Sequence, residues 1–179
     1  DRLKSASRKV KYLVRPPLPS SDTFPVEFQD FELVQDYLLT ASDRDQMHIR
    51  RRGQDGHCIY QRTIKRWHGG SSGNGKPQLV ELRRQITRRQ YELLLLTQCD
   101  TARHHRVRKL RRCFLWQKTY FQLDIYHEPQ TNLCAELILL ETYTTLSATE
   151  LAAKLPPFLT IVREVSDETC YQMYYLSLK

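Results

Sequence analysis

Basic side chains stand at alternate positions in several short segments of this sequence. Arg50 and Arg52 are spaced in this way, as are Lys109 and Arg111. Residues two apart share one face of a β-strand, so each pair would project from one side of a strand. Arg can form paired hydrogen bonds to phosphate oxygens, and Lys acts as a point charge. The candidate phosphate-binding residues are Lys9, Lys11, His48, Arg50, Arg52, Lys65, Arg83, Lys109 and Arg111.

Three carboxylates, Glu81, Asp124 and Glu136, fall on the same faces as the eight Lys and Arg residues of this set. The faces therefore hold an excess of five positive charges, which repel one another unless an anion neutralises them. The pattern predicts a polyphosphate ligand inside a wet barrel. Two alternatives remain: alternating charge is typical of the solvated face of an open sheet, and Arg50-Arg51-Arg52 alone would suit a surface that binds nucleic acid.

The composition is that of one globular domain with a basic surface. The chain has 179 residues, 40% of them hydrophobic, and 28 Lys and Arg against 20 Asp and Glu give a formal charge of +8. That charge favours an anionic partner, whether nucleotide, polyphosphate, nucleic acid or an anionic membrane surface. No apolar run reaches the roughly 20 residues of a membrane span. Because the chain begins at Asp1 rather than Met, we expect it to be a fragment of a longer protein.

Cysteine and histidine give no sign of a metal centre. The five cysteines are odd in number and widely spaced, with no CxxC pair, so we interpret them as reduced thiols in a cytoplasmic protein. His57, His104 and His105 have no cysteine or carboxylate at ligand spacing. We expect neither a zinc site nor another cofactor.

The elements that must position the charged residues are mainly strands. The predicted strands are Lys9–Val14, Phe28–Leu39, Met47–Arg52, Cys58–Arg66, Leu79–Ile86, His105–Leu115, Lys118–Tyr126 and Leu133–Glu141, with a last strand at Leu159–Val165. Short connections, such as Gly53-Gln54-Asp55-Gly56 and a hairpin near Gln117-Lys118, imply antiparallel pairing. The fold expected over 1–179 is α+β and mainly antiparallel β, a tunnel-like barrel of about eight strands with flanking helices.

Two capping signatures predict helices outside this barrel. Thr87 with Gln90 precedes a leucine-rich stretch, and Ser147 with Glu150 precedes a stretch that Pro156-Pro157 stops. A further helix-start signal lies at Ser166-Asp167-Glu168, ahead of a tyrosine-rich tail. Val10, Ile49, Val80, Leu82 and similar residues on the opposite strand faces would form the wall under these helices.

The order of these motifs resembles the CYTH superfamily, the triphosphate tunnel enzymes. The resemblance covers most of the chain and depends on seven weak motifs in order: Gln35-Asp36-Tyr37-Leu38; Met47-His48-Ile49-Arg50 with Gly53; Arg62-Thr63-Ile64-Lys65; Val107-Arg108-Lys109-Leu110-Arg111; Phe121-Gln122-Leu123-Asp124; Ala135-Glu136; and Glu164-Val165-Ser166-Asp167 with Tyr171-Gln172-Met173.

Within the superfamily, the resemblance is to the C-terminal CYTH-like domain of the TRPL translocation defect protein and its relatives. It implies an N-terminal P-loop domain in the full-length protein, binding of phosphoinositide lipids and a role in membrane trafficking, peripheral to membranes. GTP or other nucleotide binding would belong chiefly to that other domain, because this sequence has no GxxxxGK[ST] motif.

The sequence departs from the superfamily at its metal site. The resemblance implies an ExExK motif in the first strand, where this chain has Lys9-Val10-Lys11-Tyr12-Leu13. Mg²⁺ or Mn²⁺ phosphoryl chemistry needs several oxygen ligands, and only Glu81, Asp124 and Glu136 are candidates. We therefore expect no catalytic residue and no metal.

Three functions follow from the sequence. The first is non-catalytic binding of a phosphoinositide headgroup or another polyphosphate, with Lys9 and Lys11 in place of a metal. The second is a metal-dependent triphosphatase that uses Glu81, Asp124 and Glu136. The third is nucleic-acid binding through an outer basic face, a partner that we do not expect.

Overall fold

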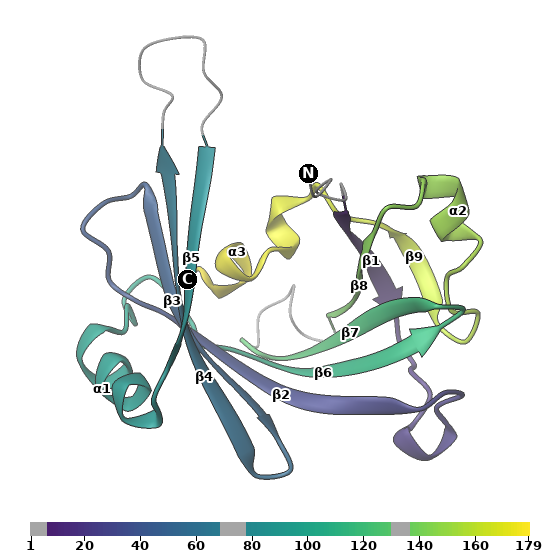
Figure 1. Cartoon of the computed structure of the whole chain (residues 1–179), viewed down its shortest axis with the longest axis horizontal. Helices are drawn as coiled ribbons and strands as arrows, with labels where there is room; N and C mark the ends of the chain where they lie inside the picture. Colours follow the sequence, from purple (N-terminus) through teal and green to yellow (C-terminus); the bar gives the residue numbers. More distant parts are fainter. Residues whose placement is uncertain (1–6, 69–77, 130–136) are drawn as a thin grey trace, which may run out of the picture. The chain divides into compact units, whose positions relative to one another are not determined.

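The structure is a computed structural model that describes residues 7–68, 78–129 and 137–179 (Figure 1). The chain forms two compact units. Unit 1 comprises Asp1–Phe31 and Lys109–Leu176, and unit 2 comprises Glu32–Arg108 and Ser177–Lys179. Strands β2 (Phe28–Tyr37) and β6 (Val107–Trp116) each run from one unit into the other. No helix among the described residues has the length and apolarity needed to cross a membrane.

Unit 2 contains an antiparallel sheet in the order β5-β4-β3-β2. Its further strands are β3 (Asp45–Gln54), β4 (His57–His68) and β5 (Gln78–Ile86). The β3–β4 turn places Asp55 and Gly56 at φ of 48° and 80°, which fits the predicted Gly53–Gly56 turn, because tight hairpin turns need positive φ. The predicted loop Gly69–Gly75 lies outside the described residues.

Helix α1 (Arg88–Gln98) covers one face of the unit 2 sheet. Its predicted capping box is confirmed: the Gln90 backbone N–H donates to Thr87 Oγ1, and the Thr87 backbone N–H donates to Gln90 Oε1. Tyr91 of the helix packs with Ile49 and Leu38 in a small core. The helix therefore occupies the apolar face of the sheet and leaves the other face to polar side chains.

Unit 1 contains the strand order β6-β7-β8-β1-β9. Its strands besides β6 are β1 (Arg8–Arg15), β7 (Thr119–Glu128), β8 (Ile138–Thr144) and β9 (Thr160–Glu164). The β6–β7 hairpin is confirmed, with Gln117 and Lys118 both at positive φ. The core of unit 1 contains Val10, a predicted wall residue, together with Tyr12, Phe114, Phe121 and Leu123.

The remaining elements are short. Helix α2 (Ala148–Ala152) begins with the predicted Ser147–Glu150 capping box. Two 3-10 helices, η1 (Ser21–Thr23) and η2 (Thr169–Tyr171), and helix α3 (Met173–Ser177) complete the described elements. The predicted helix start at Ser166–Glu168 thus precedes a single 3-10 turn, and α3 follows it.

Three parts of the sequence prediction were wrong. Within the described residues the sheet has nine strands in a linear order with β5 and β9 at its ends, and its hydrogen-bond ladder there does not close into the expected eight-stranded barrel. Strand β8 extends to Thr144, beyond the predicted end at Glu141, because Thr142–Thr144 continue the pairing with β1, while the predicted start at Leu133 lies outside the described residues. Val80 and Leu82, predicted wall residues, are exposed because they lie on the edge strand β5, beyond the reach of α1.

Candidate functional site

A row of basic side chains lies on the sheet face of unit 2 that α1 does not cover. His48 pairs with Thr63 across β3 and β4, and Thr63 pairs with Arg83 across β4 and β5. Directly opposed residues project to the same side of an antiparallel sheet, and so do residues two apart on one strand. The cationic face is defined here as His48, Arg50, Arg52, Lys65 and Arg83.

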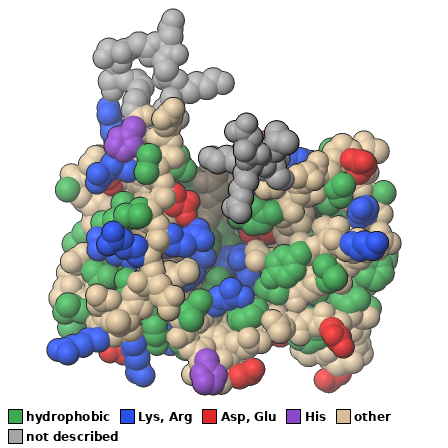
Figure 2. All heavy atoms as spheres, in the orientation of Figure 1, with side chains coloured by type: hydrophobic (Ala, Val, Ile, Leu, Met, Phe, Trp, Pro, Cys, Tyr) green, Lys and Arg blue, Asp and Glu red, His purple; other side chains and the backbone are tan. Residues whose placement is uncertain are grey.

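The charge on this face is poorly balanced. Glu81, which accepts a hydrogen bond from Arg83 Nη2 at 2.7 Å, is the only carboxylate on this side of β3, β4 and β5 in the described part of the chain. Four Lys and Arg residues therefore face one carboxylate. In Figure 2, Lys and Arg side chains gather over the part of the molecule where Figure 1 labels these strands.

Arg50 is positioned by a neutral partner. Its Nε and Nη2 donate to Gln35 Oε1 at 2.9 and 2.7 Å, and Gln35 Nε2 donates to the Tyr37 hydroxyl at 2.9 Å. Gln35 and Tyr37 are buried, which fixes this chain of hydrogen bonds. The amide orients the guanidinium and adds no negative charge of its own, so this contact leaves the guanidinium in a fixed geometry suited to an anion.

His48 reports the electrostatic character of the face. Burial first, and then Arg50, Lys65 and Arg83, lower the pKa of His48 to about 3. Its ring also packs edge-on against Tyr37, with 5.6 Å between the ring centroids. The imidazole is therefore neutral at neutral pH and adds no charge to the face, although its ring N–H can still donate a hydrogen bond.

The other predicted cations lie in unit 1, where carboxylates bind them. Asp124 accepts from Lys109 Nζ at 2.5 Å and from Arg111 Nε and Nη2 at 2.6 and 2.7 Å. Glu141 lies 2.8 Å from Lys9 Nζ and 3.5 Å from Lys11 Nζ. We call these six residues the paired cluster. Lys109 and Asp124 are both fully enclosed, at 1% and 0% exposure.

The paired cluster holds its carboxylates in the charged form. Burial opposes ionisation of Asp124, but Lys109 and Arg111 outweigh it and lower the pKa of that carboxyl group. Glu141 behaves in the same way: burial and Asp124 raise its pKa, and Lys109, Lys9 and Arg111 bring it below the usual value. Burial also lowers the pKa of Lys11, against the pull of Glu141.

Sequence reasoning missed Glu141 and Gln35. Glu141 is the first charged residue after the apolar run Leu137–Leu140, and it is buried beside Lys9, Lys11 and Arg111. That interruption of an apolar run was the available signal. The sequence analysis predicts Glu136 as the carboxylate of this strand, and Glu136 lies outside the described residues. Gln35 carries no charge, so a search for charged groups could not find it.

The described residues do not fit a divalent metal ion. No group of three or more His, Cys, Asp or Glu side chains within these residues could hold one. The oxygens of Asp124 and Glu141 accept from Lys and Arg, and Glu81 lies in unit 2 against Arg83. We therefore derive no chemical step through a metal.

Comparisons with known proteins find similar folds among solved structures. No protein-family model matches the chain, and no curated protein matches it. A solved structure described as the hypothetical protein NE1496 is 25% identical, over 97% of this chain and 99% of that one, with a TM-score of 0.62. Another, described as the inorganic triphosphatase NE1496, is 23% identical over 97% and 95%, with a TM-score of 0.61.

A third likeness is more distant. It is to a structure from Hippeastrum described as the putative adenylyl cyclase HpAC1 with a dominant triphosphatase activity, 13% identical over 82% and 83% of the two chains, with a TM-score of 0.54. Together these structures support the CYTH-like, triphosphate tunnel type of fold. The narrower resemblance to TRPL translocation defect relatives stays a prediction.

Proposed function

We propose that this protein binds a linear chain of phosphates, with inorganic triphosphate as the first ligand to test, on the cationic face of unit 2. The observation that carries the proposal is the contact between Arg50 and Gln35, because it fixes a guanidinium through a neutral amide that adds no negative charge of its own. Lys65 and Arg83 extend the positive charge across two neighbouring strands, a spacing that suits several phosphates better than one.

The choice of ligand is supported by the comparisons. Two of the similar structures are described as triphosphatases, whereas no finding concerns inositol lipids, GTP or membrane trafficking. Triphosphate thus replaces the phosphoinositide headgroup as the favoured ligand. Binding of the inositol headgroup remains an alternative hypothesis, because triphosphate and the headgroup both present clustered phosphates to Arg and Lys.

Calorimetric titration of the whole chain in EDTA tests this proposal. We expect tripolyphosphate to bind more tightly than pyrophosphate, and pyrophosphate more tightly than orthophosphate, with affinity falling as salt is added. Inositol trisphosphate is the fourth ligand of the series. A higher affinity for it than for tripolyphosphate would restore the headgroup hypothesis.

A matched pair of variants locates the site. Arg50→Gln should weaken tripolyphosphate binding by about tenfold or more, equivalent to about 1.4 kcal/mol. Arg66→Gln is the control, because Arg66 lies on the opposite face of β4 and is paired with Asp45. Equal losses in both variants, or no metal-free binding at all, would remove the cationic face as the site.

The second candidate function is metal-dependent hydrolysis of triphosphates, which the descriptions of two similar structures favour. It predicts release of orthophosphate from tripolyphosphate when Mg²⁺ or Mn²⁺ is added. The described residues offer no fitting metal site, so we expect binding without release. Turnover that is lost in Asp124→Asn, with the variant still folded, would instead establish the enzyme.

A further inference from the structure

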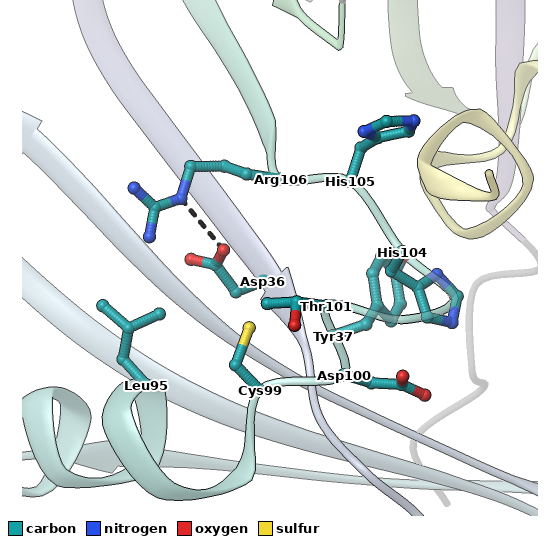
Figure 3. A pocket seen from close by; sticks show the side chains of 9 residues that line it. All are labelled: Asp36, Tyr37, Leu95, Cys99, Asp100, Thr101, His104, His105 and Arg106. Carbon is teal, nitrogen blue, oxygen red and sulfur yellow. Dashed lines mark hydrogen bonds and ion pairs between the residues drawn. The ribbon is translucent and has the colours of Figure 1, made fainter.

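A separate pocket lies on the other side of the unit 2 sheet. It has a volume of about 370 Å³ and is enclosed by the end of β2, helix α1 and residues 99–106 (Figure 3). Asp36, Leu95, Cys99, Thr101 and Arg106 line it. Asp36 follows Gln35 on β2 and therefore projects to the opposite face, whereas Tyr37, which also lines the pocket, contacts Gln35 and His48. The volume is within the range of small-molecule sites, about 300–1,000 Å³.

Asp36 is the unusual group in this pocket. Its side chain is 4% exposed, and its Oδ1 accepts from Arg106 Nε at 2.9 Å. Its second oxygen, Oδ2, is buried and has no hydrogen-bond partner among the described residues. A buried polar atom left in this state costs about 1–3 kcal/mol. The pocket thus presents an acceptor that a ligand could satisfy.

The remaining lining defines what that ligand must offer. The Nη groups of Arg106 have no hydrogen-bond partner within the described residues, and this side chain is 45% exposed. Leu95 supplies an apolar wall, and burial followed by Asp36 raises the pKa of the Cys99 thiol, which stays protonated. Because Asp36 and Arg106 cancel each other's charge, the pair favours a neutral group over an ion.

The walls of the pocket are held in place before any ligand arrives. The Asp100 backbone N–H donates to the Tyr37 carbonyl at 2.9 Å, which ties residues 99–100 to the end of β2. The last residues of the chain secure the rest of the loop: the His105 N–H donates to the Ser177 carbonyl at 2.6 Å, and Lys179 Nζ donates to the Thr101 carbonyl at 2.6 Å. A preformed pocket binds without the entropic cost of ordering its loops.

We propose that this pocket binds a small, neutral, ring-sized ligand that carries an N–H donor beside a carbonyl or ring-nitrogen acceptor. The donor satisfies Asp36 Oδ2, the acceptor receives a hydrogen bond from Arg106, and the ring packs against Leu95. An amide on an aromatic ring is the simplest compound of this class. The proposal does not depend on triphosphate binding, because neither Asp36 nor Arg106 belongs to the cationic face.

Nuclear magnetic resonance titration with three matched ring compounds tests this site: benzamide is neutral, benzylamine is a cation and benzoate is an anion. We expect benzamide to shift the backbone amides of Leu95, Cys99, Thr101 and Arg106 at lower concentrations than either ion does. A preference for benzylamine would overturn the neutral ligand class. Absence of any shift at millimolar concentrations would overturn the site. It would mean that water, and not a ligand, satisfies Asp36 Oδ2.

Variants distinguish this site from surface binding. Asp36→Asn should weaken benzamide binding at least tenfold, whereas Asp30→Asn should leave it unchanged, because both oxygens of Asp30 accept from Arg112 in unit 1. Thr101→Phe places a ring at the exposed edge of the pocket and should block binding without changing Asp36. This variant keeps the test valid if Asp36→Asn does not fold. Undiminished binding in Thr101→Phe would contradict the proposal.

Discussion

The paired cluster of unit 1 and the cationic face of unit 2 hold equal numbers of Lys and Arg residues but treat them differently. In the paired cluster, Asp124 and Glu141 contact all four cations. On the cationic face, Arg50 is oriented by the neutral Gln35, and Glu81 is the only carboxylate found there within the described residues. The paired cluster contacts its cations through carboxylates, whereas the described contact of Arg50 is with a neutral amide.

This difference separates charges that maintain a fold from charges that can bind a ligand. A buried cation that already contacts a carboxylate has little net attraction left for an anion, and breaking the pair is expensive. A cation oriented by an amide keeps a fixed geometry, and the amide adds no negative charge of its own. Each set contains four Lys and Arg residues, so the number and type of the partners are what distinguish the two sets.

The largest expected effect comes from breaking the paired cluster. Asp124→Asn would remove the carboxylate that both Lys109 and Arg111 contact, and loss of one partner from a buried pair costs about 3–5 kcal/mol. Urea unfolding monitored by circular dichroism would measure the loss. Asp45→Asn, which breaks the exposed pair with Arg66, is the control and should change the midpoint far less. Equal stabilities for the wild type and Asp124→Asn would show that the cluster is not a stabilising unit.

The next effect is the pH dependence of stability contributed by His48. Its pKa in the folded protein is about 3, below the usual value of 6.5 for histidine. Between these two pH values the imidazole is therefore protonated in the unfolded chain and neutral in the folded one. Stability should be complete above pH 6.5 and fall as the pH drops toward 3, with a slope approaching about 1.4 kcal/mol per pH unit. Thermal unfolding at a series of pH values would measure it.

The control for this prediction is His48→Gln, which keeps a hydrogen-bonding side chain but cannot titrate. Its stability should depend less steeply on pH over the same interval. Tripolyphosphate should also reduce the wild-type slope, because an anion beside Arg50, Lys65 and Arg83 offsets the repulsion that they exert on a protonated His48. Identical slopes in the wild type and the variant would mean that His48 is not held neutral by its neighbours.

A smaller effect follows from making the cationic face resemble the paired cluster. Gln35→Glu would place a carboxylate against Arg50 in the same geometry, and we expect tripolyphosphate affinity to fall about tenfold, or about 1.4 kcal/mol, with a weaker dependence on salt. Gln98→Glu adds the same charge at the exposed end of α1 and serves as the control. Calorimetry would detect the change, and an unchanged affinity would show that Arg50 does not bind the phosphate chain.

The sequence predicted the local structure more completely than the charge balance. Strand alternation and the two capping boxes depend on neighbouring residues, and the structure confirmed the strands around Arg50 and Lys109 and the helix after Thr87. The pairing of Lys9 with Glu141 depends on the register between β1 and β8, which joins residues far apart in sequence. The neutral partner of Arg50 depends on the register between β2 and β3. Neither register can be deduced from one strand alone.

The smallest expected effect is at the edge of the cationic face. Glu81→Gln would remove the one carboxylate that contacts Arg83 within the described residues and would raise the net positive charge by one. Tripolyphosphate affinity should therefore increase two- to threefold, about 0.5 kcal/mol for an exposed pair. Calorimetry at low salt would resolve this change. Under the triphosphatase hypothesis Glu81 is a metal ligand, so Glu81→Gln should abolish metal-dependent turnover instead of improving the protein's interaction with tripolyphosphate. The direction of this one change therefore separates binding alone from catalysis.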